Sequence, residues 1–193
     1  VQSSVNSFDH VLVEGNSAAA NADPLVYDMM AAFYTACSSF IAQNFGARKK
    51  KRILQTYLIC LFYSFITSLV LGVGIYLARY PFLYLFTSDK AVVEAGITRL
   101  SIMALSYSAS AFMDASIAAS RGLGKTAVPT FVVVMGSCVF RIIWIYTIFA
   151  YFHTIQSLYI LYVFSWGITA IAENIYFFHV YRHTLTGKTE SHF

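Results

Sequence analysis

The feature that most constrains the fold is a run of 26 residues, Ile53 to Ala78, that contains no charged side chain. As a helix this run would be roughly 39 Å long, which is enough to cross a hydrocarbon core of about 30 Å with some tilt. Five consecutive cations, Arg48 to Arg52, precede it, and another apolar segment ends on their other side. Basic residues concentrate in cytoplasmic loops of membrane proteins, so the pattern predicts a helical hairpin with a cytoplasmic loop. The alternatives are a solvated surface or a nucleic-acid patch.

The composition of the 193-residue chain favours the membrane interpretation. Hydrophobic residues make up 58% of the chain and charged residues only 11%, whereas a soluble globular domain is about 25% charged. A soluble core of this size would expose large apolar patches. Nine of the 13 Lys and Arg residues fall in segments that we expect to be cytoplasmic, so the net charge of +4 does not indicate nucleic-acid binding.

Hydropathy and turn residues predict an all-α, polytopic helical bundle with five full membrane-spanning helices and the end of a sixth. Asp9 to Asn21 is interpreted as an interfacial turn, with Asp23 as a helix cap and Pro24 at the first helical position. A continuous helix kinked at Pro24 is the alternative. The chain begins at Val1 without a signal peptide, and we expect it to be a piece of a longer protein. The predicted elements are residues 1–8, 16–45, 53–79, 91–120, 126–151 and 156–183, of which 16–45 follows the alternative of a helix that continues through Pro24.

Three motifs, in this order along the chain, resemble the MATE family of multidrug and toxin extrusion transporters. GNSAAANADPLVY…AFYTACSSFIAQNFGARKKKRI (15–53) resembles the eighth helix of that family and the loop after it. FMDASIAASRGLGKTAVP (112–129) resembles the end of the tenth helix and the start of the eleventh, which GSCVFRIIWI (136–145) also fits. FSWGIT (164–169) resembles the twelfth. The resemblance implies that residues 1–8 end the seventh helix and that residues 1–193 form the C-terminal lobe of a 12-helix transporter.

Asp114 is the sharpest candidate for ion coupling, because an acid inside a membrane-spanning helix is costly and functional by default. It lies seven residues before Arg121, on the same helix face and roughly 10 Å deeper. There it can exchange a proton or bind a small cation. The alternative is a structural ion pair with Arg141, which lies in an apolar run and needs a partner. Glu173 is the other acid available to Arg141, and it is also a second ion-coupling candidate or a helix–helix hydrogen-bonding group.

Aromatic and polar side chains in the predicted spans are candidates for a cavity lining. Tyrosine and tryptophan rings can stack on a cationic substrate, although packing or an interfacial belt is the commoner role of such rings. The aromatic candidates are Tyr27, Tyr34, Tyr107 and Trp166, and Asp28 is an acid in the outer half of its span.

Gln2 and Asn6 are four residues apart and therefore share one helix face. The family resemblance implies that this helix faces the cavity, so both side chains are candidate contacts for substrate or cation. Amide packing between helices is the alternative.

Gly122 and Gly124 lie in GLGKT, which is part of a nucleotide-binding pattern. A Walker A loop needs a glycine where Ala119 stands, and no strand precedes it. We therefore expect the two glycines to permit a tight turn, a structural role. No catalytic set and no zinc spacing is present, so neither an enzyme nor a metal site is expected.

The resemblance implies a secondary transporter that exchanges organic cations or drugs for Na⁺ or H⁺ by alternating access, with no other cofactor. Its expected partners are a small cationic substrate, the lipid bilayer and the N-terminal lobe of the same protein, with no nucleic acid, in the plasma (inner) membrane as a multi-pass protein. One alternative is a lipid-linked oligosaccharide flippase of the same superfamily, which would need a rim of cations around the cavity. The other is a non-transporting membrane assembly module, which would gain little from buried acids.

Overall fold

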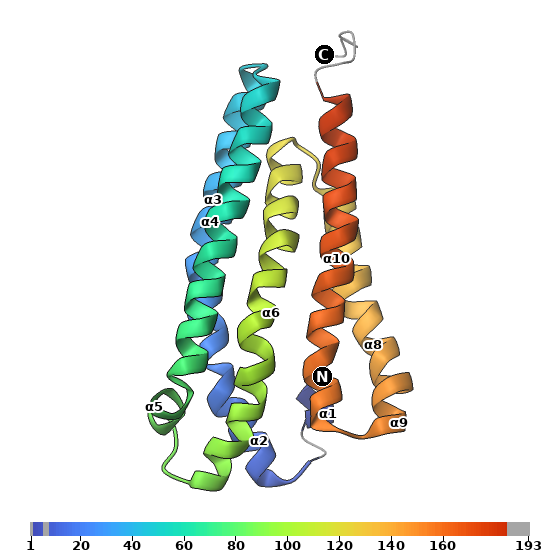
Figure 1. Ribbon diagram of the computed structural model, residues 1–193. Coiled ribbons are helices and arrows are strands. Elements are labelled where there is room, and N and C mark those ends of the chain that lie inside the picture. Colours follow the sequence, from blue (N-terminus) through green and yellow to red (C-terminus); the bar gives the residue numbers. More distant parts are fainter. Residues whose placement is uncertain (1, 6–7, 185–193) are drawn as a thin grey trace.

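The computed structural model describes residues 2–5 and 8–184, and these form a bundle of long helices without a strand among them (Figure 1). Four helices are long and apolar enough to cross a membrane, and a fifth joins them when the two parts of one bent helix count as a single span. The prediction of a polytopic all-α membrane bundle is confirmed.

The first span consists of α2 (His10–Ala20) and α3 (Ala22–Gly46), which are separated only at Asn21. A short α1 (Gln2–Val5) precedes them. The predicted interfacial turn over Asp9–Asn21 is therefore wrong, because helix begins at His10. Pro24, the third residue of α3, can account for the break: it has no N–H to donate to the carbonyl oxygen of Ala20, one turn earlier, and its ring crowds that carbonyl group. The alternative of one long helix interrupted near Pro24 therefore fits the span His10–Gly46.

The second and third spans both pack against the first span and against each other. α4 (Lys50–Leu77) is followed by the short α5 (Arg79–Tyr84) and by α6 (Lys90–Gly122), which is bent by 43° between Ala104 and Ser106. Gly72 of α4 packs at this bend: an added Cβ atom would lie 2.1 Å from the carbonyl oxygen of Ala104. A glycine at this position therefore allows the two backbones to approach closely.

The fourth span alternates between α-helical and π-helical turns. It comprises α7 (Ala127–Val133), η1 (Val134–Val139), α8 (Phe140–Trp144), η2 (Ile145–Phe149) and α9 (Ala150–Phe152). After a turn at His153, α10 (Ile155–His183) forms the fifth span. No residue in the most apolar stretch of the fourth span is fully buried. Part of this stretch packs against α10, for example Gly136 against Thr169, and the exposed apolar side chains suit a surface that faces lipid.

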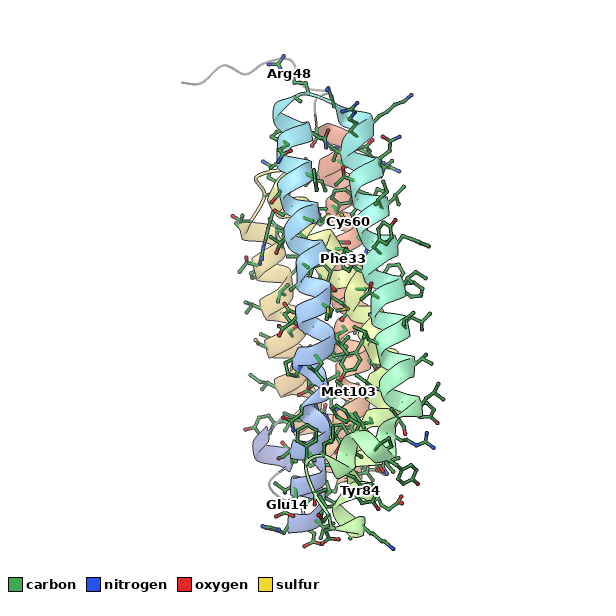
Figure 2. All side chains as sticks on the ribbon, turned by 90° about the vertical axis from the view of Figure 1, so that its left-hand side faces the viewer. Glu14, Phe33, Arg48, Cys60, Tyr84 and Met103 are labelled. Atoms are coloured by element: carbon green, nitrogen blue, oxygen red, sulfur yellow. The ribbon has the colours of Figure 1, made fainter. Side chains whose placement is uncertain are left out.

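The core lies between α3, α4, α6 and α10. Small residues of α6, among them Ala111, Ala115 and Ala119, are fully buried there, and they let the neighbouring helices approach as the sequence of this segment predicts. Large apolar side chains of α4, among them Phe62 and Leu77, are exposed. Figure 2 shows side chains projecting outward along the length of this helix.

The basic segments gather at one end of the bundle. The α3–α4 turn, the α6–α7 turn and the end of α10 lie together at the top of Figure 1, and Arg48 marks this end in Figure 2. Lys50 Nζ donates a hydrogen bond to the carbonyl oxygen of Arg182 at 2.9 Å, which ties two of these segments together. Gly124 has a φ of 75° in the turn after α6, a conformation that favours glycine. Gly122 is the last residue of α6 and packs closely against Ser38 of α3.

We expect the end with Arg48–Arg52 to face the cytoplasm, because the bias of Lys and Arg fixes orientation. In a background with Cys138, the exposed native cysteine, replaced by serine, Lys51→Cys should react with a membrane-impermeant thiol reagent only after the cells are opened. Thr154→Cys, at the opposite end, should react in intact cells. Equal labelling of both sites in intact cells would contradict the orientation.

Candidate cation cavity

A cavity of about 300 Å³ lies between α3, α6 and α10 at the depth of the membrane spans. Its wall combines aromatic rings, methionine side chains and two carboxylates, and the Trp166 ring centroid lies 6.5 Å from that of Tyr107 and 5.7 Å from that of Tyr162. Such a surface can hold an organic cation by ring stacking and charge. The lining residues are Asp23, Pro24, Tyr27, Met30, Met103, Tyr107, Ser110, Met113, Asp114, Tyr162 and Trp166.

A second, more polar cavity of about 380 Å³ adjoins the first on the side of the basic end. Its wall includes Tyr34, Ser38 and Arg121, and it shares Tyr27 and Asp114 with the first cavity. Two side chains therefore separate an apolar, aromatic space from a polar one. A carboxylate at such a boundary can meet a ligand from either cavity.

Asp114 carries a buried oxygen, Oδ2, that has no hydrogen-bond partner among the described residues. The predicted alternative of an ion pair with Arg141 is wrong. Arg141 Nε instead donates to Ser165 Oγ at 3.1 Å, and its guanidinium lies over the Tyr162 ring, 4.4 Å from the centroid. A carboxylate oxygen without a partner inside a membrane span is energetically costly, and this makes Asp114 a candidate for binding a cation from either cavity.

Glu173 of α10 is fully buried, and neither of its carboxylate oxygens has a partner in the described part of the chain. Arg141, the cation considered for it, is paired elsewhere as described above, and Glu173 lines neither of the two cavities. The neighbouring Asn174 is engaged structurally: it accepts a hydrogen bond from Tyr57 Oη at 2.6 Å and donates to the carbonyl oxygen of Ala170 at 2.8 Å. The structure thus separates Glu173 from the Asp114 cavities.

Asp23 is not a helix cap, since the cap position of α3 is Asn21. Its carboxylate forms an ion pair with Arg99 of α6 and accepts a hydrogen bond from the Tyr107 hydroxyl. The buried Arg99 also donates from Nη1 to Asn16 Oδ1 at 2.8 Å. One cation therefore joins α2 and α3 on either side of the break at Asn21, and it neutralises one of the two acids of the cavity.

The other candidates fall into three groups. Tyr27, Tyr107 and Trp166 lie in the lining of the first cavity. Asp28 is exposed and lines neither cavity, because it lies one position further around α3 than Tyr27. The Gln2 side chain and Asn6 lie outside the described part of the structure. Arg99 was not predicted as a site residue from the sequence, although a cation within a predicted membrane span is itself a signal of a functional residue.

The fold is that of a helical membrane bundle with two adjoining cavities between its helices. The MatE family model matches residues 2–147, well over half of the chain, and the chain belongs to this family. A comparison with curated proteins gives no match.

Among solved structures, the chain is similar to the Vibrio cholerae MATE transporter VcmN in its bent form, with a TM-score of 0.83 and 19% sequence identity. The match covers 94% of this chain and 41% of that one, and a mutant of the same transporter gives the same values. At this identity the likeness shows the fold alone. The chain thus spans less than half the length of the solved transporter.

Proposed function

We propose that this chain is the C-terminal lobe of a secondary transporter that exchanges a small organic cation for Na⁺ or H⁺. The observation that carries the proposal is the unpartnered, buried Oδ2 of Asp114 at the boundary of the two cavities. An organic cation and the coupling ion would satisfy this carboxylate in turn. Because each excludes the other, release of one permits binding of the other, which is the requirement for exchange.

The cavity chemistry supports a substrate with a single positive charge. Asp23 is already neutralised by Arg99, whereas Asp114 has no cation within ion-pair distance among the described residues. The rings of Tyr27, Tyr107 and Trp166 would take the apolar or aromatic body of the substrate. The carboxylate of Asp114 would match its charge.

A lobe of this kind would work with an N-terminal partner lobe in the plasma membrane. Transporters built from two repeats bind the substrate near the bilayer midplane, at the interface of the repeats, and expose the site by rocking one repeat against the other. The polar cavity beside Arg121 would give the coupling ion a route to Asp114 from the basic end.

The cavity is less suited to a lipid-linked oligosaccharide. Such a substrate carries phosphate groups, and these require cationic side chains that are free to bind them. Among the described residues, the wall of the first cavity contains no Lys or Arg, and nearby Arg99 is already paired with Asp23. A non-transporting assembly module has no need of the unpartnered Asp114.

The test is transport by the full-length protein in proteoliposomes. An imposed inward Na⁺ or H⁺ gradient should drive efflux of a fluorescent, singly charged organic cation, and collapse of the gradient with an ionophore should stop it. A neutral analogue of the same shape should not move. Gradient-independent movement of both probes would contradict exchange.

We expect the 193-residue chain alone not to transport, because the site is completed at the interface of two lobes. Proteoliposomes with this chain alone should show no more cation uptake than empty vesicles, whereas the full-length protein at equal density should accumulate the probe. Uphill accumulation by the chain alone would refute the two-lobe mechanism.

A further inference from the structure

A groove of about 500 Å³ lies between the end of α3 and the start of α4, at the basic end of the bundle. Lys49 and Arg52 form its outer part. It shares no lining residue with the two Asp114 cavities, so the proposed exchange mechanism leaves it without a role.

The α4 wall of the groove changes in chemistry with depth. Arg52, Gln55, Thr56 and Ile59 follow an i, i+3, i+4, i+7 pattern and therefore lie on one helix face. From the helix start inward, this face presents a guanidinium, an amide, a hydroxyl and then an aliphatic group. Seven residues of helix correspond to a descent of roughly 10 Å.

The α3 wall shows a similar change in side-chain chemistry with depth, read from the C-terminal end of this helix toward its N-terminus. Ala47, Asn44, Gln43 and Phe40 follow the same spacing, from the turn inward. The amide of Asn44 is held by the carbonyl oxygen of Phe40 at 2.8 Å, whereas Gln43 is exposed. Below Ala47, the α3 wall therefore also leads from polar amides to an apolar ring.

The charge at the top of the groove is uncompensated in the described part of the structure. No Asp or Glu lines the groove, and neither Lys49 nor Arg52 has a carboxylate within 4.0 Å. Lys49 caps α4 without a side-chain hydrogen bond to its first N–H groups. These N–H groups add positive potential at the same place, which favours an anion.

We propose that this groove binds an anionic phospholipid of the leaflet at the basic end. Its phosphate would lie between Lys49 and Arg52, its glycerol ester region beside the amides of Gln43 and Gln55, and the start of an acyl chain against Phe40 and Ile59. Phe40 and Ile59 are each 54% exposed, so the lower part of the groove needs an apolar occupant. A soluble phosphate ion would leave that part empty.

The test compares lipids and matched charge variants of the delipidated full-length protein by native mass spectrometry. The protein should retain phosphatidylglycerol in preference to phosphatidylcholine with the same acyl chains. Lys49→Gln with Arg52→Gln should lower the bound fraction of phosphatidylglycerol about tenfold. The control, Arg48→Gln with Lys51→Gln, removes the same charge from neighbouring residues that do not line the groove, and it should lower the bound fraction less than about twofold, because these side chains would make no direct contact with the phosphate.

The proposal would be overturned if the two double variants lost bound phosphatidylglycerol equally, or if the protein retained the two lipids equally. Either result would indicate a diffuse electrostatic attraction to the basic end and no specific site. A further variant distinguishes the source of the phosphate. Phe40→Ser with Ile59→Ser should weaken binding of phosphatidylglycerol, and added inorganic phosphate should not displace the lipid from the unmodified protein. Undiminished lipid binding by this variant together with displacement by phosphate would identify a soluble-anion site and contradict the proposal. Unchanged melting temperatures of all variants serve as the folding control.

Discussion

Asp114→Asn should abolish ion-driven efflux of an organic cation from vesicles that contain the full-length protein. Asparagine keeps the size of the side chain and its capacity for hydrogen bonds, but it has no charge to match a cation and no proton to exchange. The buried Oδ2 of Asp114 has no described protein partner to lose, so folding and membrane insertion should be unaffected. The measurement is efflux under an imposed Na⁺ or H⁺ gradient, with the protein level determined in the same vesicles.

Two further variants make this result specific. Asp114→Glu retains the carboxylate and should retain part of the activity. Asp28→Asn makes the same chemical change at an exposed acid that lines neither cavity, and it should leave efflux at the wild-type rate. Wild-type coupled efflux by Asp114→Asn would place the coupling ion elsewhere, and Glu173 would be the next residue to change.

Asp23→Leu should destabilise the protein more than Arg99→Leu, although the two substitutions break the same ion pair. The Arg99 side chain is only 9% exposed, so loss of its partner leaves a nearly buried charge, at a cost of about 3 kcal/mol. The Asp23 side chain is 38% exposed, and water screens its charge when Arg99 is removed. The cost of Arg99→Leu should therefore be smaller, about 1–2 kcal/mol.

The double variant Asp23→Leu with Arg99→Leu should be more stable than Asp23→Leu alone, because it leaves no unpaired charge. Melting temperatures of the full-length protein in detergent give this order. The exposed pair of His10 and Glu14, 3.2 Å apart on α2, provides the control, and Glu14→Leu should change stability little. Additive losses from the two single variants would show that Arg99 and Asp23 are not coupled.

Charge and hydropathy were enough to predict the spans and the end of the bundle at which the basic segments meet. They failed at α2, because Glu14 and Asn16 suggested a turn. In the structure Glu14 faces out from a helix, whereas Asn16 is buried as a partner of Arg99. A polar residue in a membrane helix requires a partner rather than a turn, and that partner lies 83 residues away.

The site was predictable only in part, for a related reason. The cost of a buried acid singles out Asp114, and the same rule applied to cations singles out Arg99. Which acid pairs with which cation depends on how each helix is rotated and how deep it lies in the bundle. Neither can be read from the order of residues along the chain. Arg99 therefore pairs with Asp23, and Arg141 with Ser165 and Tyr162, in place of the predicted pairing of Arg141 with Asp114 or Glu173.

The most direct test of the proposed exchange is infrared difference spectroscopy of the full-length protein as the coupling ion is added. If a proton couples transport, a fall in pH should produce a carboxylic acid C=O band; if Na⁺ couples it, added Na⁺ should shift a carboxylate band. In either case we expect the band to disappear in Asp114→Asn and to persist in Glu173→Gln. An ion-induced carboxyl band that is unchanged in Asp114→Asn would show that the coupling ion does not bind at Asp114.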